Sequence, residues 1–127
     1  MRRLASAALC AAFAFPVSAQ VLLQQPRVEA ELGDGAVLRA LDKVNGQTKD
    51  TELVNGATVE MFGLLVTLEE CRYPTDNPTG DAYAFLTIRE PESGRLRFEG
   101  WMIASSPALS ALDHNRYDVW VLRCRIS

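Results

Sequence analysis

The segment 105–118 contains the residue types that nucleophilic hydrolases use. Its hydroxyl, carboxylate and imidazole groups belong to Ser105, Ser106, Asp113, His114 and Asp118. In a Ser-His-Asp site the histidine takes the proton of the serine hydroxyl, and the aspartate orients the histidine. However, no G-x-S-x-G turn surrounds either serine. We therefore assign no catalytic residue from the sequence, and we keep a small hydrolase using Ser105 or Ser106 with His114 as an alternative.

A metal centre is not indicated by the same inventory of side chains. Zinc sites use several histidine and cysteine ligands, and the chain has one histidine and three cysteines, one of them inside a predicted signal peptide. Asp76, Asn77 and Asp81 carry oxygens that suit calcium, but their spacing is not that of the D-x-[DN]-x-[DN]-G loop. We predict no metal site and no cofactor, and an ordinary polar loop at these residues.

A binding surface is the other chemistry that the segment allows. The candidate binding residues are polar or aromatic and lie in or near the least regular stretch of the chain: Trp101, Ser105, Ser106, Asp113, His114, Arg116 and Tyr117. Irregular segments on a rigid scaffold often carry binding function. The competing interpretations are that the aromatic residues belong to the core and that the segment only closes one end of the fold.

The first nineteen residues have the three parts of a secretory signal peptide. Residues 2–3 are arginines, residues 4–15 are small or apolar, and residues 17–19 read Val-Ser-Ala. The apolar run is shorter than the roughly 20 residues that a membrane-spanning helix needs. We expect cleavage after Ala19, a periplasmic location and no transmembrane segment.

The cysteine count supports the same compartment. Cleavage would remove Cys10 and leave Cys71 and Cys124. Two cysteines in an exported chain indicate one disulfide. The bond would close a long loop, which is worth on the order of 4 kcal/mol in the chain-entropy model. Because neither cysteine has a C-x-x-C neighbour, we predict a structural bond.

Composition indicates one folded domain that has no reason to bind nucleic acid. The chain has 127 residues, 48% of them hydrophobic, and a net charge of −3. A modestly acidic chain lacks the basic surface that attracts nucleic acid or anionic lipid. We expect a flexible N-terminal arm at 20–35 and a single β-rich domain at 36–127.

Short apolar runs separated by turn residues predict a mostly β fold. The Asn-Gly pairs at 45–46 and 55–56 are strong turn signals, since a type I′ hairpin turn needs positive φ at both central residues. The expected strands are 36–44, 47–54, 57–62, 64–73, 82–89, 96–104 and 117–126. Seven or eight short antiparallel strands at this spacing indicate a compact sandwich or a small barrel.

Alternation within the strands predicts which faces are buried. The segment 82–89 is apolar on both faces, which predicts a central strand with cover on each side. In 117–126 the inward residues are expected to be Trp120, Leu122, Cys124 and Ile126.

Two local irregularities are also predicted. The apolar parity of 96–104 changes at Gly100, so we expect a bulge there. Ser106 as a cap and Pro107 in the first helical position predict one short helix near 106–113.

Three stretches resemble a known family. Leu38–Thr48 reads LRALDKVNGQT, Leu65–Pro74 reads LVTLEECRYP, and Gly100–Cys124 reads GWMIASSPALSALDHNRYDVWVLRC. Together they resemble the domain of unknown function 2155 family, which comprises uncharacterised small exported proteins of Gram-negative bacteria. The resemblance covers roughly 36–124 and is most specific at GWMIASSPALSALDH. It implies a periplasmic protein with one compact domain, and it supplies no activity, ligand or catalytic residue.

These observations favour a non-catalytic envelope-associated module with another envelope protein as its partner. The alternatives are the small hydrolase and a carbohydrate- or peptidoglycan-binding domain that uses exposed aromatic residues. A serine hydroxyl within reach of His114 would favour the hydrolase, and a cluster of exposed tryptophans would favour the carbohydrate module. An open edge strand or an apolar patch would favour protein binding. The oligomeric state is not predicted.

Overall fold

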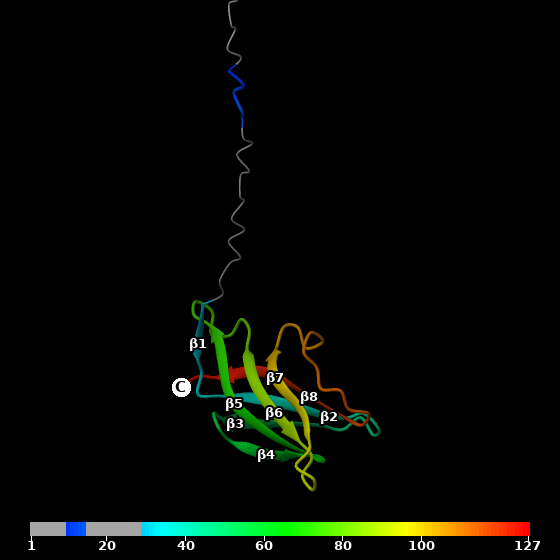
Figure 1. The fold of residues 1–127 in the computed structure, drawn as a ribbon. Helices are drawn as coiled ribbons and strands as arrows, with labels where there is room; N and C mark the ends of the chain where they lie inside the picture. Colours follow the sequence, from blue (N-terminus) through cyan, green and yellow to red (C-terminus); the bar gives the residue numbers. More distant parts are fainter. Residues whose placement is uncertain (1–9, 15–28) are drawn as a thin grey trace, which may run out of the picture.

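The computed structural model describes residues 10–14 and 29–127. These ranges contain eight strands and no helix (Figure 1). The strands are β1 Ala30–Leu32, β2 Gly35–Asp42, β3 Thr48–Val54, β4 Thr58–Met61, β5 Leu64–Pro74, β6 Tyr83–Arg89, β7 Leu96–Ile103 and β8 Tyr117–Arg125. No helix of the described part is long and apolar enough to cross a membrane. The expected cleavage site after Ala19 and most of the predicted signal peptide lie outside the described residues.

All strand pairs are antiparallel, and the strands form two sheets. Sheet A has the order β1-β5-β6-β7, and β4 pairs with another part of β5. Sheet B has the order β3-β2-β8. The prediction of a mostly β fold with seven or eight antiparallel strands is confirmed. Of its two forms, the structure has the two-sheet arrangement and not a closed barrel.

The core lies between the sheets because alternate residues of each strand point inward. Leu38 of β2, Leu86 of β6 and Val121 of β8 are at most 1% exposed. Burying one such aliphatic side chain contributes about 1.5 to 3 kcal/mol. Both sheets therefore contribute to one continuous hydrophobic core.

The expectation of cover on both faces of 82–89 holds for one face only. Ala84, Leu86 and Ile88 of β6 are fully buried in the core. Tyr83 and Phe85 point to the opposite face and are partly buried. No second layer among the described strands lies over that face, because sheet B packs against the other one.

The inward face predicted for 117–126 is wrong for three of its four residues, Trp120, Leu122 and Ile126, the last of which is 46% exposed. The register pairs Leu38 with Val121 but Val37 with Arg123, so Leu122 is an extra residue in a β-bulge. A bulge shifts the alternation by one residue. Val121 therefore faces the core before the bulge and Cys124 faces it after the bulge, whereas Trp120 and Leu122 are only partly buried.

The bulge expected at Gly100 is absent. The β6–β7 register runs without a shift from Tyr83↔Ile103 to Ile88↔Phe98, and the irregularity falls next to Arg89 instead. The apolar parity changes because β7 has apolar residues on both of its faces: Met102 is buried in the core, and Trp101 lies on the outer face. A strand with apolar residues on both faces therefore gives the same sequence pattern as a strand with a register shift.

The short helix expected near 106–113 is also absent. The backbone makes a single turn, in which the Leu109 amide donates to the Ser106 carbonyl at 3.1 Å. Leu112 is 6% exposed and Leu109 is 78% exposed, although residues three apart would share one face of a helix. A helix rises only about 1.5 Å per residue, so an extended chain spans the distance from β7 to β8 more easily.

The Asn-Gly pairs form turns, but not of the predicted type. Gly46 and Gly56 have positive φ, whereas neither Asn45 nor Asn55 does. The first pair ends the β2–β3 hairpin loop, in which the Gly46 amide donates to the Asp42 carbonyl at 2.8 Å. The second leads from sheet B to sheet A. A type I′ turn would need positive φ at both central residues.

Part of the expected arm at 20–35 belongs to the sheets. β1 pairs with the end of β5, and β2 begins at Gly35. The Gly33 amide donates to the Cys71 carbonyl at 2.7 Å. A Cβ at Gly35 would lie 2.0 Å from the Leu53 carbonyl oxygen. These glycines permit close packing, so the arm prediction is wrong for residues 30–35, while 20–28 lie outside the described residues.

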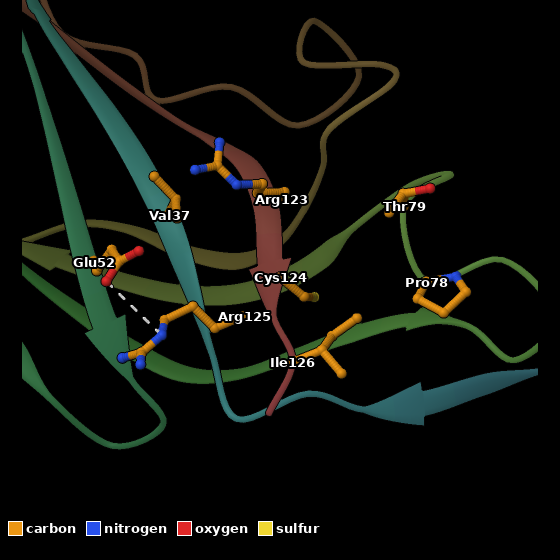
Figure 2. Close-up of a pocket in the computed structure, with 8 residues that line it drawn as sticks. All are labelled: Val37, Glu52, Pro78, Thr79, Arg123, Cys124, Arg125 and Ile126. Atoms are coloured by element: carbon orange, nitrogen blue, oxygen red, sulfur yellow. Dashed lines mark ion pairs between the residues drawn. The ribbon is translucent and has the colours of Figure 1, made fainter.

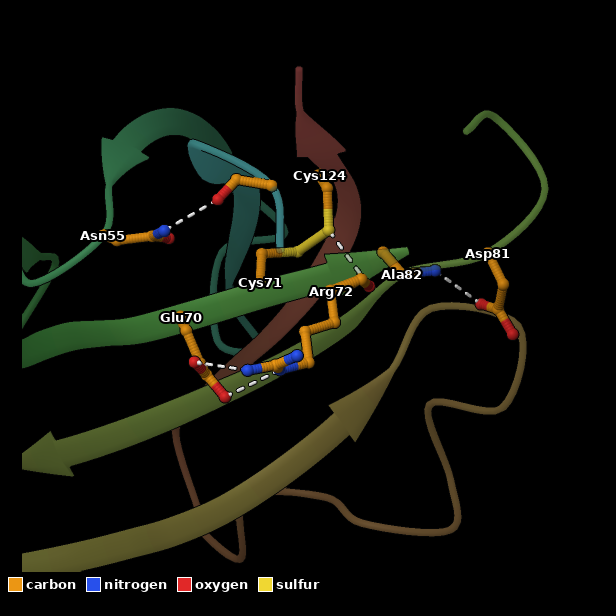
Figure 3. The surroundings of a disulfide bond; sticks show 8 residues. Asn55, Glu70, Cys71, Arg72, Asp81, Ala82 and Cys124 are labelled. Carbon is orange, nitrogen blue, oxygen red and sulfur yellow. Dashed lines mark hydrogen bonds and ion pairs between the residues drawn. A yellow bond between two sulfur atoms is a disulfide. The ribbon is translucent and has the colours of Figure 1, made fainter. Parts of the chain in front are cut away.

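A disulfide between Cys71 and Cys124 links the two sheets (Figure 3). Cys71 belongs to β5 of sheet A and Cys124 to β8 of sheet B, and their Cα atoms are 5.6 Å apart. Both side chains lie in the core. This is the pairing that the cysteine count predicted, and it closes the sandwich at the end where β1 leads into β2.

Candidate functional site

Ser105 is engaged with an aspartate and not with the histidine. Its Oγ donates to Asp81 Oδ2 at 2.7 Å, and its amide donates to Asp81 Oδ1 at 3.0 Å. Asp81 Oδ1 also accepts from the Ala82 amide at 2.8 Å, as Figure 3 shows. Asp81 therefore joins the β5–β6 loop to the β7–β8 loop through its hydrogen bonds to Ser105.

His114 has no basic nitrogen available for catalysis. Its Nδ1 accepts from the backbone amides of Arg116 at 3.0 Å and Tyr117 at 3.1 Å. An Nδ1 that accepts two hydrogen bonds carries no proton, so the proton of the neutral ring is on Nε2. Burial, assisted by the positive charge of Arg97, lowers the pKa of His114. The ring is thus held neutral as a backbone acceptor, and a general base would need a free lone pair.

The other members of the predicted hydrolase set are not brought together either. The Ser106 amide donates to the Ile103 carbonyl at 3.1 Å, which forms the turn after β7. The Asp113 backbone carbonyl accepts from Arg97 Nη2 at 3.2 Å. No hydrogen bond among the described residues joins either serine to His114. The geometry gives no support to the hydrolase alternative.

Cations from three parts of the fold hold the segment between β7 and β8. Lys43 donates through Nζ to the His114 carbonyl, and Arg97 donates to the Asp113 carbonyl. Arg116 itself pairs with Asp42 of β2. Three charged contacts to one loop are typical of a structural role. This agrees with the alternative that the segment only closes one end of the fold.

Asp42 is a buried carboxylate that sequence reasoning missed. Its side chain is 4% exposed and accepts from Arg116 and from the Val44 amide at 3.0 Å. The hydrogen bond from Arg116 lowers the pKa of Asp42, which keeps the carboxylate ionised. An aspartate just before an Asn-Gly turn is a signal for such a local bond, although its partner 74 residues away leaves no local signal.

Trp101 lies on the outer face of sheet A, in a group of aromatic and apolar side chains. It is 41% exposed and meets Phe85 edge to face, with ring centroids 5.3 Å apart. The register places Phe85 opposite Trp101, and Tyr83 opposite Ile103. An open, almost wholly apolar depression of about 380 Å³ lies here and is lined by Ala30, Arg72, Tyr83, Trp101 and Ile103.

We call these outward residues of sheet A the aromatic face: Ala30, Leu32, Arg72, Tyr83, Phe85, Trp101 and Ile103. Arg72 is fixed at its rim, because Nε and Nη2 donate to Glu70 at 3.0 and 3.3 Å (Figure 3). The sequence analysis selected Trp101 alone. The sequence feature that pointed to other residues of this face was the apolar character of both faces of 82–89.

The second tryptophan lies elsewhere. Trp120 is on β8 of sheet B, opposite Arg39, and is partly buried. It lines a separate depression together with Pro107 and Ala111 of the loop before β8. The two tryptophans therefore belong to different sheets and form no cluster, so the criterion for the carbohydrate module is not met.

The outer face of sheet B is charged, in contrast to the aromatic face. Arg39 donates to both oxygens of Asp50 at 2.7 and 2.8 Å. Arg125 lies 3.9 Å from Glu52 beside an open depression of about 390 Å³, which Figure 2 shows next to Arg123. The two faces of the sandwich thus differ in chemistry: the outer face of sheet B carries several ion pairs, whereas an apolar depression lies among the aromatic residues of sheet A.

Metal ligation has no geometric support in the described part of the chain. Within 10–14 and 29–127, no three histidine, cysteine, aspartate or glutamate side chains converge on a point where they could hold an ion. The Asn77 amide donates to the Pro74 carbonyl at 3.0 Å, so the 74–81 loop is folded by its own hydrogen bonds.

Comparison with known proteins gives a family but no activity. Residues 36–124 match the model of a family described as an uncharacterised protein conserved in bacteria, DUF2155. An uncharacterised protein of Rickettsia prowazekii (strain Madrid E) is 30% identical over 88 residues, which cover 67% of this chain and 57% of that protein. The chain thus spans little more than half of the relative that it matches. No solved structure matches the chain.

Proposed function

Because this chain belongs to the DUF2155 family of uncharacterised bacterial proteins, we propose its function from its own structure. It is a non-catalytic binding module of the bacterial periplasm that docks another envelope protein on the aromatic face of sheet A. The observation that carries this proposal is the unpartnered group of side chains around Trp101, which is 41% exposed on β7, the edge strand of sheet A.

The composition of the aromatic face supports a protein partner. Tryptophan, tyrosine and arginine are the residues that most often dominate the binding energy of protein interfaces. Here Trp101, Tyr83 and Arg72 line one depression. All three lie on adjacent paired strands, so little conformational entropy is lost when a partner binds. A rigid apolar patch of this kind typically marks an interaction surface.

Protein is favoured over carbohydrate by the lining of the depression. Sugar sites need several polar groups directed at hydroxyls, whereas this depression is almost wholly apolar. Leu32 adds a side chain that is 54% exposed in the same row as Arg72 and Tyr83. Aliphatic surface of this kind favours apolar side chains of a partner.

The periplasmic location is part of the proposal and rests on two supports. The first is the signal-like sequence at 1–19. The second is the Cys71–Cys124 disulfide, since such bonds persist in oxidising compartments.

Site-specific photo-crosslinking tests the docking surface in the full chain, expressed with its own N-terminus in a Gram-negative host that carries a member of the family. A photoreactive amino acid replaces Leu32, which is exposed on the aromatic face. We expect an adduct with a second envelope protein, and we expect Trp101→Ala to abolish it. The matched control carries the photoreactive residue at Thr48, which is exposed on sheet B. Equal adducts at both positions, or none at residue 32, would contradict the proposal.

A further inference from the structure

We infer that the segment docked on the aromatic face is basic as well as apolar: an apolar anchor fills the depression, and a lysine or arginine lies against Glu99 and the Trp101 ring. This inference rests on the proposed function and names the chemistry of its partner. The argument has three steps, which concern the depression, the charges around it and the charge of the whole chain.

The depression selects an apolar anchor. Its volume of about 380 Å³ is bounded by the rings of Tyr83 and Trp101 and by Ile103. The one charged group in its wall is Arg72, and its charge is balanced by the two hydrogen bonds to Glu70. Arg72 therefore needs no ion pair with an acidic group of a partner. Its methylene groups add to the apolar wall of the depression.

The charges around the depression select a basic neighbour for that anchor. The register places five charged residues on the outer face of sheet A: Glu60, Glu70, Arg72, Arg89 and Glu99. Glu70 pairs with Arg72, and Arg89 donates to the Gly94 carbonyl at 3.1 Å.

Glu99 is the unbalanced charge nearest to Trp101. It is exposed and lies two residues before Trp101 on the same face. It takes part in no ion pair within the described residues. A cation placed here meets the carboxylate and the negative face of the indole ring together.

The charge of the whole chain acts in the same direction. The net charge is −3, so a basic segment is attracted before contact and an acidic one is repelled. Because Glu99 is exposed, its ion pair should be weak and sensitive to salt. The apolar anchor therefore supplies most of the affinity, and Glu99 supplies the preference for a basic partner.

The test uses three synthetic peptides of equal length: one alternating leucine and lysine, one with glutamate for lysine, and one with serine for leucine. Titrations follow the two indole N–H signals by NMR, and Trp101→Phe distinguishes Trp101 from Trp120. We expect the leucine–lysine peptide to shift the Trp101 signal alone. It should bind at least about tenfold more tightly than either other peptide, and added salt should weaken its binding.

Two matched variants measure the contribution of the Glu99 charge to peptide binding. Glu99→Gln should weaken binding of the leucine–lysine peptide by about two- to fivefold. Glu52→Gln removes an exposed carboxylate from sheet B and should leave the affinity unchanged. Equal binding of the lysine and glutamate peptides, or no effect of Glu99→Gln, would overturn the inference.

The outcomes also separate this inference from the proposed function. If no peptide shifts the Trp101 signal while crosslinking at residue 32 still depends on Trp101, the basic chemistry is wrong and the docking surface stands. If a chitin-derived oligosaccharide shifts the Trp101 signal and the peptides do not, the ligand is a glycan, and both proposals about a protein partner fail. Loss of the crosslink itself overturns the proposed function.

Discussion

Asp42 at the end of β2 and Arg116 immediately before β8 form a two-point ion pair, with Nη2–Oδ2 and Nε–Oδ1 distances of 3.1 and 3.4 Å. The carboxylate is almost fully buried, whereas half of the arginine side chain is exposed. The pair connects the β2–β3 turn to the loop that returns from sheet A. It thereby anchors the C-terminal end of the segment 105–118, from which the sequence suggested catalysis, to β2.

The first prediction concerns this pair. Asp42→Asn and Arg116→Gln should each lower the melting temperature by several degrees at pH 7, because the first removes the charge of the ion pair and the second leaves the buried Asp42 carboxylate without its partner. The pKa of Asp42 is lowered in the folded chain. Its contribution is therefore complete above the ordinary carboxyl range and is lost as pH falls through the lowered value. The melting temperatures of wild type and Asp42→Asn should converge in acid. Asp50→Asn, at an exposed pair, should have a smaller effect.

The second prediction concerns His114. Burial lowers its pKa below the ordinary 6.5, so the fold favours the neutral ring. The stabilisation from His114 is complete above pH 6.5 and decreases as pH falls from there to the lowered pKa. Because the chain has one histidine, urea unfolding between pH 7.5 and 5.5 isolates it. His114→Asn, whose Oδ1 accepts amide protons without titrating, should remove this dependence. A slope retained in His114→Asn would assign it to other groups.

The third prediction compares neighbouring serines. Ser105→Ala removes the 2.7 Å hydrogen bond to Asp81 and should cost about 0.5 to 1.5 kcal/mol of stability. Ser106→Ala should be close to neutral, since the helix that Ser106 was expected to cap does not form. Guanidinium unfolding of the two variants measures the difference. Equal losses would mean that the Ser106 hydroxyl has a structural role comparable to that of Ser105.

The fourth prediction concerns the disulfide. Replacing Cys71 and Cys124 by alanine should lower stability by on the order of 4 kcal/mol, because the unfolded chain gains the entropy of a long open loop. Non-reducing peptide mapping should recover the linked pair from the native protein. In the unprocessed chain, which retains residues 1–19, Cys10→Ser should leave the stability unchanged, because this cysteine is exposed and unpaired. Two free thiols in protein isolated from the periplasm would contradict the prediction.

The fifth prediction concerns export. The signal-like residues 1–19 should be removed, which leaves Gln20 as the mature N-terminus. Mass spectrometry of the periplasmic fraction measures this directly. A substitution of Ala19 by a bulky charged residue should leave the precursor uncleaved, because the cleavage site requires a small side chain. An intact precursor confined to the cytosol would refute both the location and the proposed envelope partner.

The local pattern of the sequence was sufficient for seven of the eight strands, all except β1, and for the disulfide pairing. Period-two alternation in segments such as 82–89 depends only on neighbouring residues. The turns at Gly46 and Gly56, which separate strands, are also local features. The cysteine pairing followed from the count, since the two cysteines that remain after the predicted cleavage allow one bond. The strands and turns survive in the structure because each is determined within one strand or one turn.

Other features depended on which strands lie side by side. The bulge at Leu122 exists because β8 must align with β2, and the segment after Ser106 makes a single turn and no helix because it must connect two sheets. The neutral state of His114 requires two amide donors in a particular loop geometry.

The exposure of the aromatic face also depended on which strands lie side by side. Alternation showed that 82–89 is apolar on both sides, but it contains no information about which side another sheet covers. Only the pairing of β5, β6 and β7, with sheet B packed against the opposite face, leaves Tyr83 and Trp101 facing outward. The sequence by itself determined all strands but β1, because local periodicity suffices for them, and it determined the disulfide through the two cysteines that remain after the predicted cleavage. Tertiary structure decided the binding surface, because exposure depends on contacts between residues far apart in the chain.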